Sequence, residues 1–330
     1  MYATDWKEVV APDEEARFAD LAVRMLAIKQ AHDAKYQERG RALHRQGLAG
    51  VRGVFTVPET LALPPELHVG PIRPGARHNA YVRFSAGSWA RVKKQQPDVR
   101  AVAFKLVGVP GKKVLTGEEA PGTQDFLLNH GPTVPVRTPD EFVALAEAVS
   151  RSQAQALFRL IGSIGFGRAF SVLKGTIAGL NLPFSSYGSA TFHSIAPSRL
   201  GPTACKWSLT GAGDAAGKGT LHEDLVARLA GGLRYTLRVR LYQDPTRTPI
   251  EDATRDWEGD WIEVGSLEIP ATDVTTPEAR ALADEIERMS FDPWHAVEEL
   301  RPLGAISRAR KVAYYEASVK HRDVAPEPQA

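Results

Sequence analysis

The chain has 330 residues, of which 43% are apolar and 24% charged, the composition of a soluble globular protein with a substantial core. Its 41 basic and 39 acidic side chains leave a formal net charge of +2, so no long-range field favours nucleic acid or anionic lipid. The single cysteine, Cys205, excludes an internal disulfide and a cysteine metal cluster. The start MYATDWKEVV lacks the basic and apolar regions of a secretory signal, and we expect a cytoplasmic protein.

Helical and strand-like patterns alternate along the chain. Apolar residues at helical spacing predict an N-terminal helix over about 14–45. Short runs rich in β-branched and aromatic residues follow, separated by Gly and Pro, and they predict antiparallel strands from about 50 to 270. A helical insertion is predicted over about 140–182, with a break near the glycines of IGSIGFGRAF. Further helices are predicted over about 277–322, before a disordered tail, 323–330.

Two groups of strands, with helices at both ends and between them, are typical of one α+β domain. We find no internal repeat and no linker long enough to divide residues 1–330. The sequence therefore predicts a single domain built on an antiparallel β-barrel core with flanking helices.

Several common enzyme motifs are missing from the sequence. GVPGKKV lacks the spacing and the hydroxyl residue of a Walker A loop. No GxSxG elbow occurs, and no two of the nine histidines are four residues apart, as a helical zinc site would require. The commonest nucleotide-enzyme, serine-hydrolase and zinc-enzyme interpretations are therefore not supported.

Six segments occur in an order and spacing that matches one known family. They are GRALHRQGLAGVRGVFTV at 40–57, the stretch 82–111, TQDFLLNHGPTVPVRTPDEF at 123–142, SSYGSATF at 185–192, TPIEDATRDW at 248–257, and 291–322. Together they resemble the haem-containing core of catalases, particularly the short catalase-like proteins without extra terminal domains. The resemblance covers roughly residues 30–322. It implies a catalase-like haem fold that holds haem b through a tyrosine ligand to the iron.

The resemblance implies that the iron ligand lies in RARKVAYYEASVKHR. A phenol of ordinary pKa does not ionise at neutral pH unaided, but iron and a nearby guanidinium both favour the phenolate. Arg310 precedes Tyr314 by four residues, which matches the family's Arg-x-x-x-Tyr spacing and puts both on one helix face. The family's second arginine follows its ligand by seven residues, whereas Arg322 follows Tyr314 by eight and Tyr315 by seven. We prefer Tyr314, with Tyr315 as the alternative.

On the opposite side of the haem, the resemblance makes His44 the acid–base residue. A neutral imidazole can take a proton from peroxide and return it to the departing oxygen. Asn129 matches the family's amide that orients peroxide, and Ser85 matches a serine that fixes the histidine tautomer.

Haem propionates are two carboxylates, and guanidinium groups bind carboxylates through paired, charge-assisted hydrogen bonds. Arg41 and Arg83 match the family's propionate-binding arginines, and Arg322 is a third candidate. Arg100 fits the family pattern too, but we expect it to fix local structure.

The implied function is haem-dependent decomposition of hydrogen peroxide or an organic hydroperoxide, as a catalase or a peroxidase with a small organic reductant, in the response to oxidative stress. The alternatives are a hydroperoxide-rearranging enzyme of the allene-oxide-synthase type and a non-catalytic haem-binding protein.

Ala190 replaces a common histidine of long catalases, so no nicotinamide-nucleotide site is expected. We expect 156–182 to form a helix pair packed on the barrel or a subunit interface and not a membrane contact, although it is apolar enough for a membrane-surface contact. A homo-oligomer is compatible with the resemblance.

Overall fold

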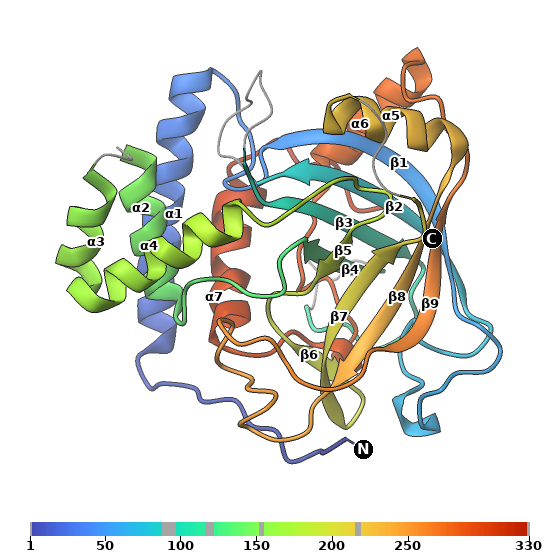
Figure 1. Ribbon diagram of the computed structural model, residues 1–330, viewed down its shortest axis with the longest axis horizontal. Helices are drawn as coiled ribbons and strands as arrows, with labels where there is room; N and C mark the ends of the chain where they lie inside the picture. The colour runs from blue at the N-terminus through green and yellow to red at the C-terminus, as the bar shows by residue number, and fades with distance from the viewer. Residues whose placement is uncertain (1, 88–96, 116–121, 152–154, 215–218, 329–330) are drawn as a thin grey trace.

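The computed structural model describes residues 2–87, 97–115, 122–151, 155–214 and 219–328 (Figure 1). Its strands form one antiparallel sheet in the order β5-β4-β3-β2-β1-β9-β8-β7-β6, and an additional β5–β7 pairing closes eight of them into a barrel. The strands are β1 (Gln46–Thr56), β2 (Arg77–Ala86), β3 (Arg100–Val107), β4 (Thr123–Asn129), β5 (Thr191–His193), β6 (Ser198–Leu200), β7 (Thr203–Gly211), β8 (Leu233–Leu241) and β9 (Ile262–Ile269). The predicted antiparallel barrel is therefore confirmed.

The barrel interior is a packed core. Strand residues alternate between the two faces, so Phe84, Phe104 and Phe126 point inward, where the rings of Phe104 and Phe126 stack at 4.6 Å between centroids. Trp207 meets Phe126 edge to face at 5.1 Å between centroids. The side chains between these inward residues lie on the outer wall, and any site built from them lies outside the barrel.

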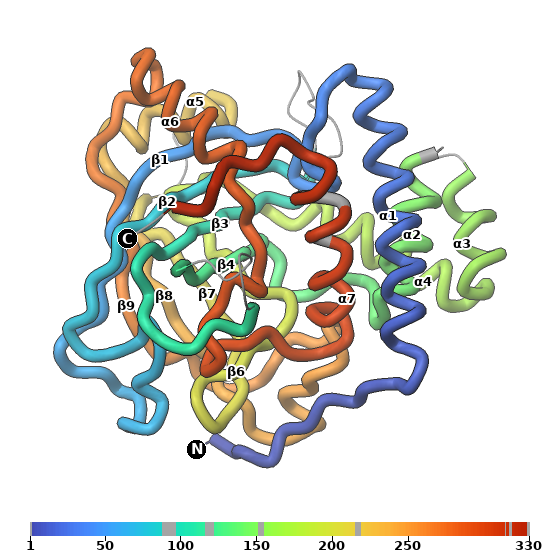
Figure 2. The backbone as a smooth tube through the Cα atoms, turned by 180° about the vertical axis from the view of Figure 1, so that it is seen from behind, coloured from blue at the N-terminus to red at the C-terminus, as the bar shows by residue number. Residues whose placement is uncertain are grey.

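The helices cover the barrel from two sides. They are α1 (Glu14–Tyr36), α2 (Pro139–Arg151), α3 (Ala156–Ile164), α4 (Phe166–Leu180), α5 (Leu221–Gly231), α6 (Pro277–Arg288) and α7 (Ala305–Tyr314), with short 3₁₀ turns at Pro65–Leu67 and Glu298–Leu300 and a π-helical segment, Tyr315–Lys320. Helices α1 to α4 form a lobe beside the barrel, α6 packs on β1 and β2, and α7 lies between lobe and barrel (Figures 1 and 2). Among the described helices, none combines the length and the apolar character needed to cross a bilayer.

Helix α1 is shorter than predicted. It ends at Tyr36, because Gln37 adopts a left-handed conformation with φ of 54°, and its N–H donates to the carbonyl of Asp33. The side chain of Asp33 then accepts from the N–H of Gly40 at 3.1 Å and pairs with Arg45. These contacts fold residues 37–45 back against the helix, so the predicted helix over 37–45 is wrong.

The described part of the C-terminal tail, 323–328, is not disordered, which corrects the prediction. The N–H of Ala325 donates to the carbonyl of Arg288 at 3.0 Å. Glu327 pairs with the fully buried Lys105, with 2.7 Å between carboxylate and ammonium. A buried ammonium needs counter-charges, and Asp125 and the tail both supply them.

Candidate functional site

Ser85 and Asn129 share the outer wall of the barrel. Ser85 lies opposite Ala101 across β2 and β3, and Ala101 lies opposite Asn129 across β3 and β4. Residues in direct register point to the same face, whereas the adjacent Phe84 and Leu128 point inward. Two strand spacings separate Ser85 from Asn129, roughly 10 Å between backbones. Ser85 and Asn129, both predicted to lie on the His44 side of the haem, therefore line one patch of the wall.

The backbone just before β1 holds His44 against this patch. Its Nδ1 lies 3.2 Å from the Ser85 hydroxyl, and the structure records no hydrogen bond at Nε2 from the described residues. The backbone is left-handed, with φ of 51°, a conformation that non-glycine residues adopt only when their surroundings enforce it. The enforcing contacts are a hydrogen bond from the His44 N–H to Gly87, at 3.3 Å, and one from Arg83 to the His44 carbonyl, at 2.8 Å.

The surroundings of His44 keep its ring neutral. Burial, followed by the positive charges of Arg83, Arg310 and Arg41, lowers the pKa of His44 to about 3. The ring is therefore neutral throughout the neutral range, and in the tautomer whose Nδ1–H donates to the Ser85 hydroxyl, Nε2 is free to accept a proton. Arg310, one of these three charges, lies on α7.

Three predicted arginines converge beside His44. Arg83 makes a two-bond ion pair with Glu287 of α6, at 2.8 and 3.0 Å. Arg41 donates to the backbone carbonyls of Glu287 and Met289 at 2.9 and 2.6 Å, and Arg322 donates to the same two carbonyls at 2.6 and 2.8 Å. We call these three arginines with Glu287 the arginine cluster.

Positive charge exceeds negative charge in the arginine cluster. Burial, followed by the charges of Arg83 and Arg322, lowers the pKa of Arg41 well below its ordinary value. Burial opposes the ionisation of Glu287, but Arg83, Arg41 and Arg322 outweigh it and hold the pKa of this carboxyl below its usual range. Three guanidinium groups thus share one carboxylate and the carbonyl end of α6.

Helix α7 carries the predicted ligand at its last residue, Tyr314, whose side chain lies outside the described part of the structure. The side chain of Tyr315 is 43% exposed. The helix changes from α to π at this point, over Tyr315–Lys320. A π-helix bonds i to i+5 and so takes one more residue per turn. Arg322, eight residues after Tyr314, lies just past the end of this segment.

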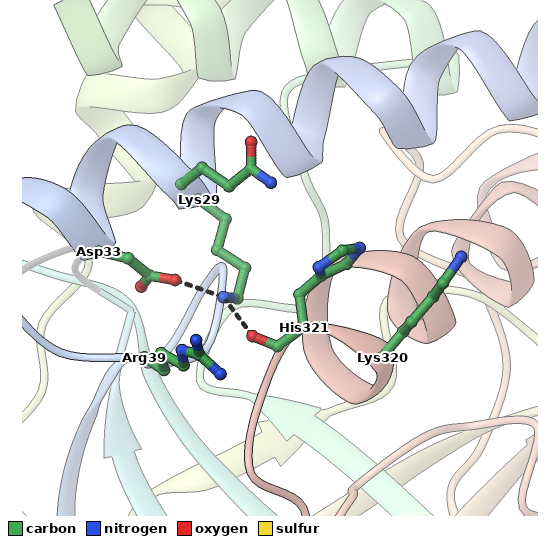
Figure 3. Close-up of a pocket in the computed structure, with 6 residues that line it drawn as sticks. Lys29, Asp33, Arg39, Lys320 and His321 are labelled. Atoms are coloured by element: carbon green, nitrogen blue, oxygen red, sulfur yellow. Dashed lines mark hydrogen bonds and ion pairs between the residues drawn. The ribbon is translucent and has the colours of Figure 1, made fainter.

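A cavity of about 320 Å³ lies between α1 and the π-helical segment, and it contains none of the predicted site residues. Lys29, Arg39, Lys320 and His321 line it (Figure 3). Lys29 donates to the backbone carbonyl of His321 at 3.1 Å and also pairs with Asp33. These contacts tie α1 to His321, just past the π-helical segment.

The sequence did not single out Glu287 or Tyr187. The Tyr187 hydroxyl donates to the Ser85 carbonyl at 2.9 Å and so fixes the strand under the serine. Glu287 is one of several acidic residues in an ordinary amphipathic helix, and only the fold brings it to three distant arginines.

Arg100, predicted to be structural, lies 3.7 Å from Asp98, and its N–H donates to the ring of His130.

Solved structures share this fold. They include catalase A from Saccharomyces cerevisiae (TM-score 0.60, 16% identity, 89% of this chain and 63% of that chain), a bacterial catalase (0.62, 16%, 92% and 63%) and a fungal catalase (0.58, 15%, 88% and 62%). The chain thus spans about 63% of the length of these catalases. No family model and no curated protein sequence matches it. The chain has a catalase-like fold in a short form, and identities this low show the fold alone.

Proposed function

We propose that the chain binds one haem b between the outer barrel wall and α7 and acts on hydrogen peroxide or an organic hydroperoxide. The observation that carries the proposal is the neutral His44, hydrogen-bonded to Ser85, on the same wall as Asn129. The helix that acts on it electrostatically, α7, ends in the predicted ligand Tyr314. Haem binding alone does not require an acid–base group beside an amide.

The arginine cluster fits a haem by its charge. Arg41, Arg83 and Arg322 gather around Glu287, and Asp323 acts on Arg322 as a second negative charge. Two propionate carboxylates would add negative charge beside these guanidinium groups, which bind carboxylates through paired hydrogen bonds. Arg41 and Arg83 are buried, so a bound anion would offset part of the free-energy cost of burying their charge.

Separate residues of the chain would then bind the iron, transfer the proton and orient the substrate. When bound, the ferric haem supplies the redox centre at which a peroxide O–O bond is cleaved. Tyr314 would hold the iron, and the Arg310 charge one helical turn earlier would favour its phenolate form. Nε2 of His44 would accept the peroxide proton and return it to the departing oxygen, while the Asn129 amide would donate a hydrogen bond that orients the substrate.

The experiment that tests the proposal is a haem titration of Tyr314→Phe and Tyr315→Phe beside the unmodified chain. We expect a high-spin ferric tyrosinate spectrum for the unmodified chain and for Tyr315→Phe, and its loss in Tyr314→Phe. A chain that takes up no haem would overturn the proposal, and loss in Tyr315→Phe alone would make Tyr315 the ligand. Oxygen evolution from hydrogen peroxide would identify a catalase, whereas rearranged products from a fatty-acid hydroperoxide would identify the alternative enzyme.

A further inference from the structure

Helix α4 exposes a stripe of large apolar side chains. Phe166, Phe170 and Ile177 are 71%, 58% and 55% exposed, and their spacing of four and seven residues places them on one side of the helix. Ala169 and Val172, on another side of α4, are buried. Leu182, 40% exposed, continues the stripe just past the helix end. Contiguous apolar surface of this kind marks an interaction site.

The described structure leaves this stripe uncovered. Helix α4 runs along one surface of the helical lobe, and α1 runs along the opposite surface (Figures 1 and 2). The sequence predicts a helix pair packed on the barrel or a subunit interface for this segment, and α3 does pack on α4. That pairing buries Ala169 but leaves the two phenylalanines in solvent, which the sequence pattern does not reveal.

The charge around the stripe has one sign. Between Glu147 and Asp214 the sequence holds six basic residues and no acidic one. Lys174 is exposed and lies next to the stripe on α4, four residues after Phe170. Arg168 is engaged by Glu141 from α2, and Arg159 donates to Gln155. The surface beside the apolar residues therefore offers a cation and no carboxylate of its own segment.

We propose that the α4 face, made of Phe166, Phe170, Lys174, Ile177 and Leu182, docks on a phospholipid bilayer with anionic headgroups. Aromatic and aliphatic side chains enter the boundary between headgroups and acyl chains, and a lysine stem reaches back to the headgroups. A second copy of the chain is a poorer occupant, because symmetric pairing of this face brings together two surfaces of the same charge. The inference rests on this surface and not on the haem chemistry.

The face adjoins the candidate site. A Cβ added at Gly131 would come within 3.1 Å of the Leu182 side chain, and Gly131 follows Asn129 by two residues.

The test is sedimentation of the full chain with vesicles of phosphatidylcholine alone and of phosphatidylcholine with phosphatidylglycerol. We expect binding to the anionic vesicles, weakened about tenfold or more in Phe166→Ser/Phe170→Ser because two large apolar groups are lost. Lys174→Glu should also weaken binding, most strongly at low salt. Val23→Ser, an exposed apolar residue of α1, is the matched control and should bind unchanged.

Sedimentation velocity without vesicles completes the test. A monomer that binds anionic vesicles through α4 supports the inference. A dimer that Phe166→Ser/Phe170→Ser dissociates would overturn it, because the occupant would then be a second copy. Absence of vesicle binding, or binding that the double variant leaves unchanged, would overturn it as well.

Discussion

His44 owes its chemistry to its position more than to its type. An ordinary histidine titrates near pH 6.5, whereas burial and three arginine charges lower the pKa of His44 to about 3. The same arginine that lowers this pKa, Arg83, also holds the His44 carbonyl and thereby the left-handed backbone. One guanidinium thus holds the backbone that carries the imidazole and, after burial, contributes most to keeping the ring neutral.

Replacing His44 by alanine should leave haem uptake intact and lower the rate of peroxide consumption by about 100-fold or more, the usual contribution of a general acid–base group. Ser85→Ala should lower the rate about tenfold, because the serine acts only through the ring it orients. Initial rates of peroxide consumption on haem-loaded protein measure both effects. An unchanged rate in His44→Ala would reject the assigned role.

The pKa of His44 also predicts how stability depends on pH. Between pH 6.5 and about 4, the unfolded chain binds a proton at His44 that the folded chain does not bind. The free energy of unfolding should therefore fall as the pH falls through this range, and His44→Gln should reduce the slope by up to about 1.4 kcal/mol per pH unit. Urea unfolding at several pH values measures the slope. His222→Gln, an exposed position on α5, is the control and should leave it unchanged.

At the scale of the elements, the candidate site is shaped by where α1 and α7 end. Helix α1 stops at Tyr36 and frees the loop that carries His44, and α7 passes at Tyr315 into a π-helical segment that ends two residues before Arg322. Both features shape the candidate site, and the apolar periodicity of the sequence reveals neither.

Gly165 joins α3 to α4 with φ of 79°, a backbone conformation that side chains disfavour although the space around it is open. Gly165→Ala should therefore lower the free energy of unfolding by about 1–2 kcal/mol. Gly162→Ala, inside α3 and equally open, should raise it by about 0.5–1 kcal/mol because alanine favours a helix. Chemical denaturation of both variants checks the prediction, and equal effects would contradict it.

At the scale of the whole molecule, the arginine cluster joins parts of the chain that are far apart in sequence. Arg41 comes from the loop after α1, Arg83 from β2, Glu287 from α6 and Arg322 from the C-terminal region. The tail then crosses to Lys105 on β3 through Glu327. The barrel, the N-terminal loop and the C-terminal helices are thus held together at the place where a haem would bind.

Glu287→Gln should lower the unfolding free energy of the haem-free chain by about 1–3 kcal/mol, a value reduced because the Glu287 side chain is 31% exposed. Haem should restore more stability to this variant than to the unmodified chain, since its propionates would replace the lost carboxylate. Thermal unfolding with and without haem measures both effects. Glu268→Gln, which breaks an exposed pair with Arg234, should change stability by less than about 0.5 kcal/mol. Equal gains from haem in the variant and the unmodified chain would argue against propionates in the cluster.

The sequence by itself determined the antiparallel barrel and the helical insertion, because strand alternation and helical periodicity are local patterns. The alternation in RYTLRVRLYQ corresponds to β8, and the glycines of IGSIGFGRAF mark the break between α3 and α4. The resemblance carried by the order and spacing of six segments also pointed to His44, Ser85 and Asn129, of which the fold brings His44 and Ser85 into hydrogen-bond contact.

Only the tertiary structure decided where α1 ends, that Glu287 joins the arginines, that the tail is ordered and that α4 stays exposed. The physical reason is the same in each case. A buried charge such as Lys105 or Arg83 takes the counter-charge that folding brings within reach, and sequence distance does not reveal which one that is. Likewise, an apolar residue such as Phe166 is buried only if another surface arrives to cover it, which no local pattern can tell.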